Sequence, residues 1–363
     1  YGGRTKMDKR VDSNLLLDMS GMLNDIGFNL DDELGVANMA EYHYDDGAVY
    51  GFPTKYENSR WILINEDMFK EAGLDIPYDG WTYSEFLEDA EKLTHGEGQD
   101  KVYGVCWARK QSGNSILNAL DGVLGANQIY KNEEGTEVNF DNDVYRAGFN
   151  LVKETLDKGY AIPIEDEFSE DISVANTFLQ GKCAIMLGVA QMRLCMDQEN
   201  YPHDFMTALV PAPVPDDEKY NTEFYRKQIG TTGAGDLLSI SANTKYPEAS
   251  FEFAMWYLKG GMSPLVQGGR IPLWNGVNKD EVLSVLKEKA QGSIDMDSME
   301  NYLSLDTTQG VAAIKGHASS EISSAWFEEF DAMCYGKQSV DQTVQNMEKR
   351  GNELIQTELS SQK

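Results

Sequence analysis

Apolar and polar positions between residues 61 and 73 predict a strand followed by a short helix. Residues 61–65 (WILIN) form an apolar run of strand length, and its last residue, Asn65, can cap a helix. Residues 66–72 have the length of a short helix, and Gly73 is suited to stop it. This order of strand, cap, helix and glycine is typical of an α/β protein.

A second helix is predicted to begin after Thr82. Glu85 stands three residues beyond Thr82, which is the spacing of a capping box. In the turns that follow, Phe86, Ala90 and Leu93 recur at helical spacing. Both the cap and the apolar periodicity therefore favour a helix that reaches Leu93.

The rest of the chain continues this alternation of short apolar runs and helical periods. Strands are expected within residues 42–50 (two strands about a turn), 102–107, 183–187 and 230–240. Helices are expected at residues 115–124, 143–158, 171–180, 251–258, 279–290, 319–334 and 339–354. The alternation predicts an α/β fold with mostly parallel sheets.

Length and charge narrow the class of protein. A chain of 363 residues exceeds one ordinary domain, so two lobes are expected. The formal net charge of −29 argues against nucleic acid as a partner, because phosphate binding needs a basic surface. It also argues against polybasic docking to an anionic membrane. No stretch is long and apolar enough for a membrane span, and no signal peptide is recognisable.

The four cysteines (Cys106, Cys183, Cys195 and Cys334) include no CxxC pair, and their spacings are long. This pattern argues against a metal site. Apolar neighbours around Cys106, Cys183 and Cys334 favour buried free thiols. The sequence alone leaves a disulfide open.

Several motifs occur in an order that is specific to one family. They are YGFP at 50–53, WILINEDMFKEAGLDIP at 61–77 and WTYSEFLEDAEKLT at 81–94. In this order they resemble the first crossover of the extracellular solute-binding proteins (family 1) of bacterial ABC importers, in the cluster that contains maltose-binding protein. One departure is mild: the strand ends Ile64-Asn65 where the family often has Tyr-Asn.

Later motifs extend the resemblance toward the C-terminus. They are Gly181-Lys182 before the run 183–187 with Gly188 after it, PAPVP at 211–215, GRIP at 269–272 and GKQSV at 336–340. The resemblance implies a type II periplasmic-binding-protein-like fold, with two α/β lobes joined by three crossings. It implies an N-terminal lobe of residues 1–53 plus 231–272 and a C-terminal lobe of residues 54–230 plus 273–363.

The resemblance also sets an expectation about the N-terminus. The family begins with a strand, a helix and a second strand, whereas residues 1–26 resemble a later part of the N-terminal lobe. We therefore expect roughly the first two β-α units of the family to be absent from this chain. The family further implies a secreted protein, either periplasmic or lipid-anchored on the extracellular side of the membrane.

The sequence shows no signature of covalent catalysis. It has no GxSxG, no HExxH and no Cys-His signature, and its four histidines are scattered. The glycine-rich stretch 230–235 lacks the spacing of a phosphate-binding loop and is better read as a backbone crossing. No enzyme activity, metal or cofactor is expected.

Six Trp and eighteen Tyr residues point to a sugar ligand. Sugars present flat C–H faces that stack on aromatic rings and hydroxyls that bond to carboxylates, amides and guanidinium groups. Any single Trp can equally be a core residue. By their positions near the crossings or the ends of strands, the candidate ligand-binding residues are Tyr56, Glu57, Trp107, Arg109, Gly188, Gln191, Asp236 and Trp274. The resemblance supports Glu57, because maltose-type proteins place a ligand-binding carboxylate after the hinge proline. It adds Trp326, because the family places an aromatic residue near this position of a C-terminal helix.

These observations predict the substrate-binding component of a bacterial ABC transporter. It would capture a sugar or oligosaccharide by hinge closure, act as a monomer and deliver the ligand to permease subunits. Three alternatives stay open: a non-sugar ligand such as a polyamine or peptide, a glycoside hydrolase with a catalytic carboxylate pair, and a sensor or scaffold that uses the same closure without transport.

Overall fold

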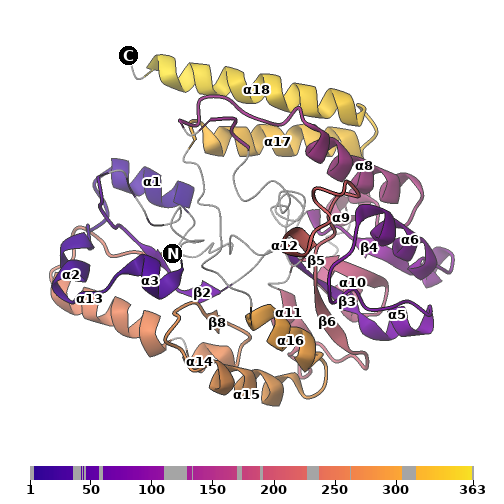
Figure 1. Cartoon of the computed structure of the whole chain (residues 1–363), viewed down its shortest axis with the longest axis horizontal. Helices are drawn as coiled ribbons and strands as arrows, with labels where there is room; N and C mark the ends of the chain where they lie inside the picture. The colour runs from indigo at the N-terminus through magenta and orange to yellow at the C-terminus, as the bar shows by residue number, and fades with distance from the viewer. Residues whose placement is uncertain are drawn as a thin grey trace. The chain divides into compact units, whose positions relative to one another are not determined.

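The fold is that of a computed structural model, shown in Figure 1, which describes most of the chain. The described residues are 4–35, 42, 44, 46–56, 60–109, 129–132, 134–169, 174–188, 191–226, 237–261, 263–304 and 316–361. They divide into two compact units. Unit 1 comprises the described residues within Tyr1–Asn58 and Gly230–Lys289, and unit 2 those within Ser59–Ile229, Ala290–Leu305 and Ile314–Lys363.

Unit 2 is built on a four-stranded sheet with the strand order β4-β5-β3-β6. The strands are β3 (Trp61–Asn65), β4 (Tyr103–Cys106), β5 (Cys183–Leu187) and β6 (Thr207–Pro211). Strands β4 and β5 are parallel, whereas β3 is antiparallel to both β5 and β6. The expectation of mostly parallel sheets is therefore wrong for this sheet. Strand β3 is the first strand of unit 2 along the chain. Only parallel neighbours need a long crossover, so β3 can lie antiparallel to the strands beside it.

Helices of unit 2 connect and cover these strands. They are α5 (Glu66–Glu71), α6 (Tyr83–Leu93), the 3₁₀ turn Gly98–Asp100, α8 (Asp143–Asp157), α9 (Ile164–Ser169), α10 (Val174–Leu179), α11 (Met192–Cys195), α12 (Glu223–Arg226), α16 (Met296–Leu303), α17 (Ser319–Cys334) and α18 (Val340–Ser361). Figure 1 shows α17 and α18 running side by side, and α8 contacts both.

The local signals in the sequence operate as predicted around β3. Asn65 Oδ1 accepts a hydrogen bond of 3.1 Å from the amide of Met68 at the start of α5. Gly73, just past α5, has the positive φ of +70° that glycine tolerates. Thr82 and Glu85 form both bonds of the capping box at α6. These features form between residues that are close in the sequence, so they do not depend on distant parts of the chain.

The core of unit 2 lies between the sheet and its helices. All five residues of β3 and all five of β5 are buried. Phe149 of α8 packs against two rings of α17, with centroids 5.7 Å from Trp326 and 5.6 Å from Phe330. Helix α8 therefore bridges the C-terminal helix pair to the rest of the core.

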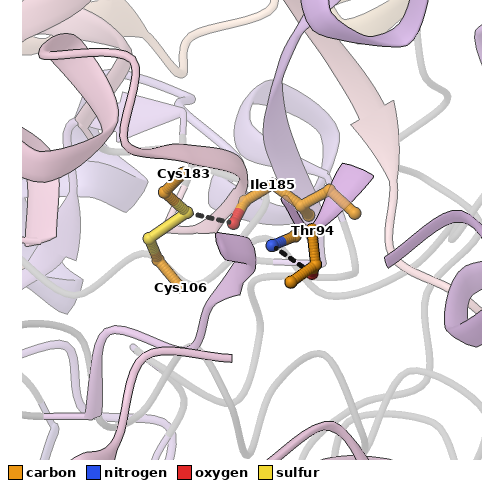
Figure 2. Close-up of a disulfide and its surroundings, with 5 residues drawn as sticks. Thr94, Cys106, Cys183 and Ile185 are labelled. Carbon is orange, nitrogen blue, oxygen red and sulfur yellow. Dashed lines mark hydrogen bonds between the residues drawn. A yellow bond between two sulfur atoms is a disulfide. The ribbon is translucent and has the colours of Figure 1, made fainter. Parts of the chain in front are cut away.

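A disulfide joins two neighbouring strands of the sheet, as Figure 2 shows. It links Cys106 in β4 to Cys183 in β5, and both residues are fully buried. The expectation of free thiols is wrong for these two, because the fold brings together cysteines 77 residues apart. Cys195 and Cys334 are free.

Unit 1 contains two short antiparallel strand pairs and a set of helices. Strand β1 (Phe52–Pro53) pairs with β7 (Leu237–Leu238), and β2 (Lys55–Tyr56) pairs with β8 (Ile271–Pro272). The helices are α1 (Arg4–Asp12), α2 (Ser20–Asp25), α3 (Leu30–Leu34), α13 (Pro247–Trp256) with the π-helical turn Tyr257–Gly261, α14 (Ser263–Val266) and α15 (Lys279–Ala290). The apolar core of this unit includes Met19, Phe52, Phe251 and Leu273.

Two further expectations differ from the structure or lie outside it. The strands expected within residues 42–50 are wrong for the described residues, where the carbonyl of Val49 instead accepts from Met19. The helix expected at 115–124 lies outside the described residues.

Candidate ligand-binding site

The carboxyl ends of β4 and β5 lie at one edge of the sheet in unit 2. Because the two strands are parallel and Cys106 is paired with Met186, Ala108 and Gly188 each lie two residues past this pair. Both have positive φ, +54° for Ala108 and +106° for Gly188. Ligands of open α/β sheets bind outside the carboxyl ends of strands, so this edge is the candidate site in unit 2.

Trp107 enters the protein core at this edge. Its side chain is 2% exposed, and its Nε1 donates a 2.8 Å hydrogen bond to Thr155 Oγ1 of α8. The ring lies 5.7 Å from that of Phe86 of α6. A buried indole leaves no open face for a sugar ring, so the packing argues against direct ligand contact by Trp107.

Arg109 is held by a carboxylate and two rings. Its Nε and Nη2 donate to the two carboxylate oxygens of Asp331, at 2.7 and 2.9 Å. The guanidinium carbon lies 4.2 Å from the ring centroid of Phe327 and 5.8 Å from that of Phe168. Bidentate pairing and cation–π contacts together occupy this side chain. Arg109 thus ties the end of β4 to α17.

Trp326 lies in the same helix as Asp331 but belongs to the core. It is 1% exposed, and its ring stacks on that of Phe330 with centroids 4.8 Å apart. Helix α17 therefore directs Trp326 inward, where the indole has no face for a ligand.

Gly188 and Gln191 form the turn that follows β5. The amide of Gln191 donates a 2.9 Å hydrogen bond to the carbonyl of Gly188, and α11 begins directly afterwards. Only glycine adopts φ of +106° without strain. Gln191 is half-buried, and its side chain makes no capping bond to α11.

In unit 1, Trp274 follows β8 and contacts a carboxylate. Its Nε1 donates a 2.6 Å hydrogen bond to Glu33 Oε2 at the end of α3. Asn29 caps the start of α3, and its side chain accepts a hydrogen bond from the amide of Asp31. Tyr42 donates to Asp31 Oδ1 at 2.9 Å, and burial together with this carboxylate raises the pKa of Tyr42. Trp274 stays a predicted ligand-binding residue, and the sequence did not single out Glu33 as its partner.

The other predicted site residues are only partly described. Tyr56 lies in β2, paired through the backbone with Ile271, and its side chain lies outside the described residues. Glu57 and Asp236 also lie outside them. Within the described part of the chain, no cluster of three or more His, Cys, Asp or Glu side chains is arranged to hold a metal ion. None of the described helices has the length and apolar character needed to cross a membrane.

Comparison with solved structures identifies the fold. A sugar transporter protein from Rhizobium etli in an open conformation has a TM-score of 0.70 at 17% identity, with 96% of this chain and 83% of that chain covered. An ABC substrate-binding protein from Listeria monocytogenes in complex with cycloalternan has a TM-score of 0.69 at 16% identity, covering 97% and 88%. The GacH receptor of Streptomyces glaucescens, solved unliganded and with acarbose, has a TM-score of 0.65 at 15% identity, covering 96% and 80%.

These likenesses confirm the predicted α/β fold of the type II periplasmic-binding-protein class. The sequence provides independent evidence, because residues 2–259 match the family of bacterial extracellular solute-binding proteins. The match includes the first-crossover motifs at 50–94 from which the resemblance was recognised. The chain belongs to the bacterial extracellular solute-binding protein family.

Proposed function

We propose that this protein is the substrate-binding component of a bacterial ABC importer that captures a sugar or oligosaccharide. The family match over residues 2–259 carries the solute-binding role. Structures of similar fold that hold cycloalternan and acarbose support a carbohydrate as the ligand. The protein would carry its ligand unchanged, so no catalytic residue is assigned.

The two compact units correspond in this proposal to the two lobes. The expected lobe boundary at residues 53 and 54 lies close to the unit boundary between Asn58 and Ser59. At the third crossing the expected boundary is residue 272, whereas unit 1 continues to Lys289. Strand β2 pairs with β8 within unit 1, next to the crossings that are expected after residues 53 and 272.

Capture would follow from differential affinity for two arrangements of the lobes. A ligand that contacts both lobes binds the closed arrangement more tightly than the open one and so shifts the population toward it. The proposed contacts are Gly188 and Gln191 from unit 2 and Trp274 from unit 1. Tyr56, Glu57 and Asp236 complete the proposed set from their places near the crossings.

The proposed oligomeric state, location and partner of the protein follow from its family. The ligand-loaded protein would act as a monomer outside the cytoplasm, periplasmic or lipid-anchored, and would dock onto permease subunits of the importer. Its formal net charge of −29 favours a soluble monomer and disfavours binding to nucleic acid.

A thermal-unfolding screen tests the proposal. Glucose, maltose, maltotriose, xylobiose, mannitol, single amino acids and spermidine would each be added to the protein. A ligand that binds only the folded state stabilises it by about 2.7 kcal/mol at a hundredfold excess over Kd. We expect one sugar class to raise the midpoint and to be recovered intact.

Other outcomes of this screen would contradict the proposal in separate ways. A shift with spermidine or an amino acid alone would retain the fold and exclude a sugar as the ligand. A shift accompanied by hydrolysis of the sugar would identify a glycoside hydrolase. Normal growth of a permease-deletion strain on the bound sugar would argue against a role in transport.

A further inference from the structure

An indole and a carboxylate from distant parts of the sequence form a local pair in unit 1. Trp274 Nε1 donates to Glu33 Oε2 at 2.6 Å. Two more hydrogen bonds fix the segment around this pair. The amide of Asn275 donates to the carbonyl of Glu33 at 2.9 Å, and Asn275 Nδ2 donates to the carbonyl of Asp32 at 3.1 Å. The end of α3 and the segment after β8 are thereby held in one geometry.

The indole itself is fixed by its own backbone turn. The amide of Val277 donates to the carbonyl of Trp274 at 3.1 Å. A Cβ atom at Gly276 would lie 2.3 Å from Cζ2 of the indole, so the ring lies close against the glycine backbone. Trp274 and Glu33 are both half-buried, which leaves part of each side chain open to solvent.

The carboxylate retains capacity for a further hydrogen bond. The bond from Trp274 occupies Oε2, and within the described residues no Lys or Arg forms an ion pair with Glu33. Oε1 can therefore accept from a donor that comes from outside. A hydrogen bond to an ionised carboxylate is roughly twice as strong as one between neutral groups.

The pair also lies near the first crossing of the chain, where unit 1 ends at Asn58. Trp274 follows β8 by two residues, and the amide of Leu273 donates to the carbonyl of Thr54 at 3.2 Å, just before β2. Strand β2 ends at Tyr56, close to the boundary of unit 1 at Asn58. The pair therefore lies beside the place where the chain first leaves unit 1.

We propose that Glu33 and Trp274 form a sugar-binding pair in unit 1. The indole stacks on the C–H face of a sugar ring, and Glu33 Oε1 accepts a hydrogen bond from a ring hydroxyl. This inference rests on the proposed function, and it adds Glu33 as a residue that selects for a hydroxyl at one position of the sugar. The bond from Trp274 orients the carboxylate before the ligand arrives, which lowers the cost of ordering it on binding.

The substitution Glu33→Gln separates a binding role from a structural one. Its amide oxygen still accepts from Trp274 Nε1, so folding stability is retained, but the negative charge is lost. The free energy of a hydrogen bond to a charged group corresponds to about a 10- to 150-fold change in affinity. By isothermal titration with the sugar that gives the largest thermal shift, we expect Kd to rise by about tenfold or more. Asp32→Asn is the matched control on the same helix, at an exposed residue, and should change Kd less than about twofold.

A second readout concerns the hydroxyl itself. Mono-deoxy versions of the same sugar would be titrated against the wild-type protein and Glu33→Gln. One deoxy sugar should bind both proteins equally, because the hydroxyl that Glu33 recognises is absent. The variant Trp274→Phe should weaken binding and remove part of the ligand-dependent change in tryptophan fluorescence.

The outcomes distinguish this inference from the proposed function. Binding of a sugar by the wild-type protein with equal Kd for Glu33→Gln would overturn the pair and leave the proposed function intact. The pair would also be overturned if each deoxy sugar lost the same affinity, relative to the parent sugar, in the wild-type protein and in Glu33→Gln. If the wild-type protein binds no sugar, both proposals fail together.

Discussion

The guanidinium of Arg109 is enclosed within unit 2 by the carboxylate of Asp331 and the rings of Phe327 and Phe168. Only 13% of the Arg109 side chain and 26% of that of Asp331 are exposed. Removing one partner of such a pair leaves the other charge partly buried without compensation. The pair therefore belongs to the stability of unit 2.

We expect Asp331→Asn to lower the free energy of unfolding by about 2 kcal/mol, measured by urea denaturation. Arg109→Lys should also destabilise, because lysine cannot reproduce the bidentate geometry. Arg146→Lys is the control, since Arg146 pairs with exposed Asp143 and Asp341 and should change stability by less than about 1 kcal/mol. A lower sugar affinity of Arg109→Lys with unchanged stability would instead make Arg109 a ligand contact.

Asp89 of α6 gives a pH-dependent prediction. Burial raises the pKa of Asp89 to about 6, despite Lys92 nearby, above its ordinary value of 3.8. The ionised form is thus disfavoured in the folded protein. The resulting cost to stability is absent below about pH 4 and complete above about pH 6. We expect Asp89→Asn to raise the midpoint of thermal unfolding at pH 8 and to leave it unchanged at pH 4.

A pH series of the difference between the wild-type protein and Asp89→Asn checks this expectation. Glu88→Gln removes the same charge from an exposed neighbour and should give a small difference at every pH. A stabilisation by Asp89→Asn that is equal at pH 4 and pH 8 would exclude titration of Asp89 as its cause.

Single residues were the hardest to assign from the sequence. Tryptophan is a residue type that suits a sugar site, yet contacts with Thr155 and Phe330 hold Trp107 and Trp326, respectively, in the core. The contact between Glu33 and Trp274 was not predictable, because the two residues lie 241 positions apart in the sequence. A residue type gives a chemical capacity, whereas long-range packing decides which side chains meet.

At the scale of elements, β4 is held closely against α6. The amide of Gly104 donates a 2.9 Å hydrogen bond to Thr94 Oγ1, which in turn donates to the carbonyl of Ala90 at 2.6 Å. Figure 2 shows Thr94 near the disulfide between β4 and β5. A Cβ atom at Gly104 would lie 2.3 Å from the carbonyl oxygen of Ala90. The strand and helix can approach this closely only because residue 104 lacks a side chain.

Gly104→Ala should therefore cost about 2–3 kcal/mol of unfolding free energy, because backbone atoms of α6 would have to move. Gly21→Ala is the contrasting variant, at an exposed position of α2 with no atom within 4 Å of the added Cβ. It should stabilise by up to about 1 kcal/mol. Urea denaturation measures both, and equal effects would mean that helix propensity, not contact with α6, decides the outcome at Gly104.

Elements with local signals were predicted well from the sequence. The caps at Asn65 and Thr82 fixed the starts of α5 and α6, and the run 183–187 coincides with β5. The antiparallel direction of β3 was not predictable from its apolar run, because sheet direction depends on which strand lies alongside. The expected strands at 42–50 failed for a similar reason, since Val49 bonds to Met19.

At the scale of the whole molecule, all four cysteines lie within the described residues and only two of them are joined. After unfolding without a reductant, alkylation should label two thiols, and after reduction it should label four. In the folded protein neither Cys195 nor Cys334 should react at pH 8. Burial raises the pKa of Cys195 to about 12, and it also raises the pKa of Cys334.

Mass spectrometry of the alkylated protein would check this count. The variant Cys106→Ala/Cys183→Ala should show two labelled thiols under both conditions and lose up to about 4.5 kcal/mol of stability, as loop-closure entropy predicts for this separation. Labelling of four thiols in the unreduced wild-type protein would contradict the disulfide.

The fold and family of the molecule were recognisable from a few motifs, because their order along the chain is specific even where identity to solved relatives is below 20%. The lobe boundaries stay a prediction. The third crossing is expected at residue 272, whereas the compact unit 1 continues to Lys289, within α15.

The position of the disulfide has a consequence for how the protein reaches its oxidised state. Cys195 follows Cys183 by twelve residues, whereas Cys106 precedes it by 77. Loop-closure entropy alone favours the shorter loop by about 1.6 kcal/mol, or roughly 16-fold. In an oxidising environment an unfolded chain would therefore form the Cys183–Cys195 pair first, which would make Cys183 unavailable to Cys106. Productive maturation requires either that β4 and β5 assemble before oxidation or that an isomerase corrects the early pairing.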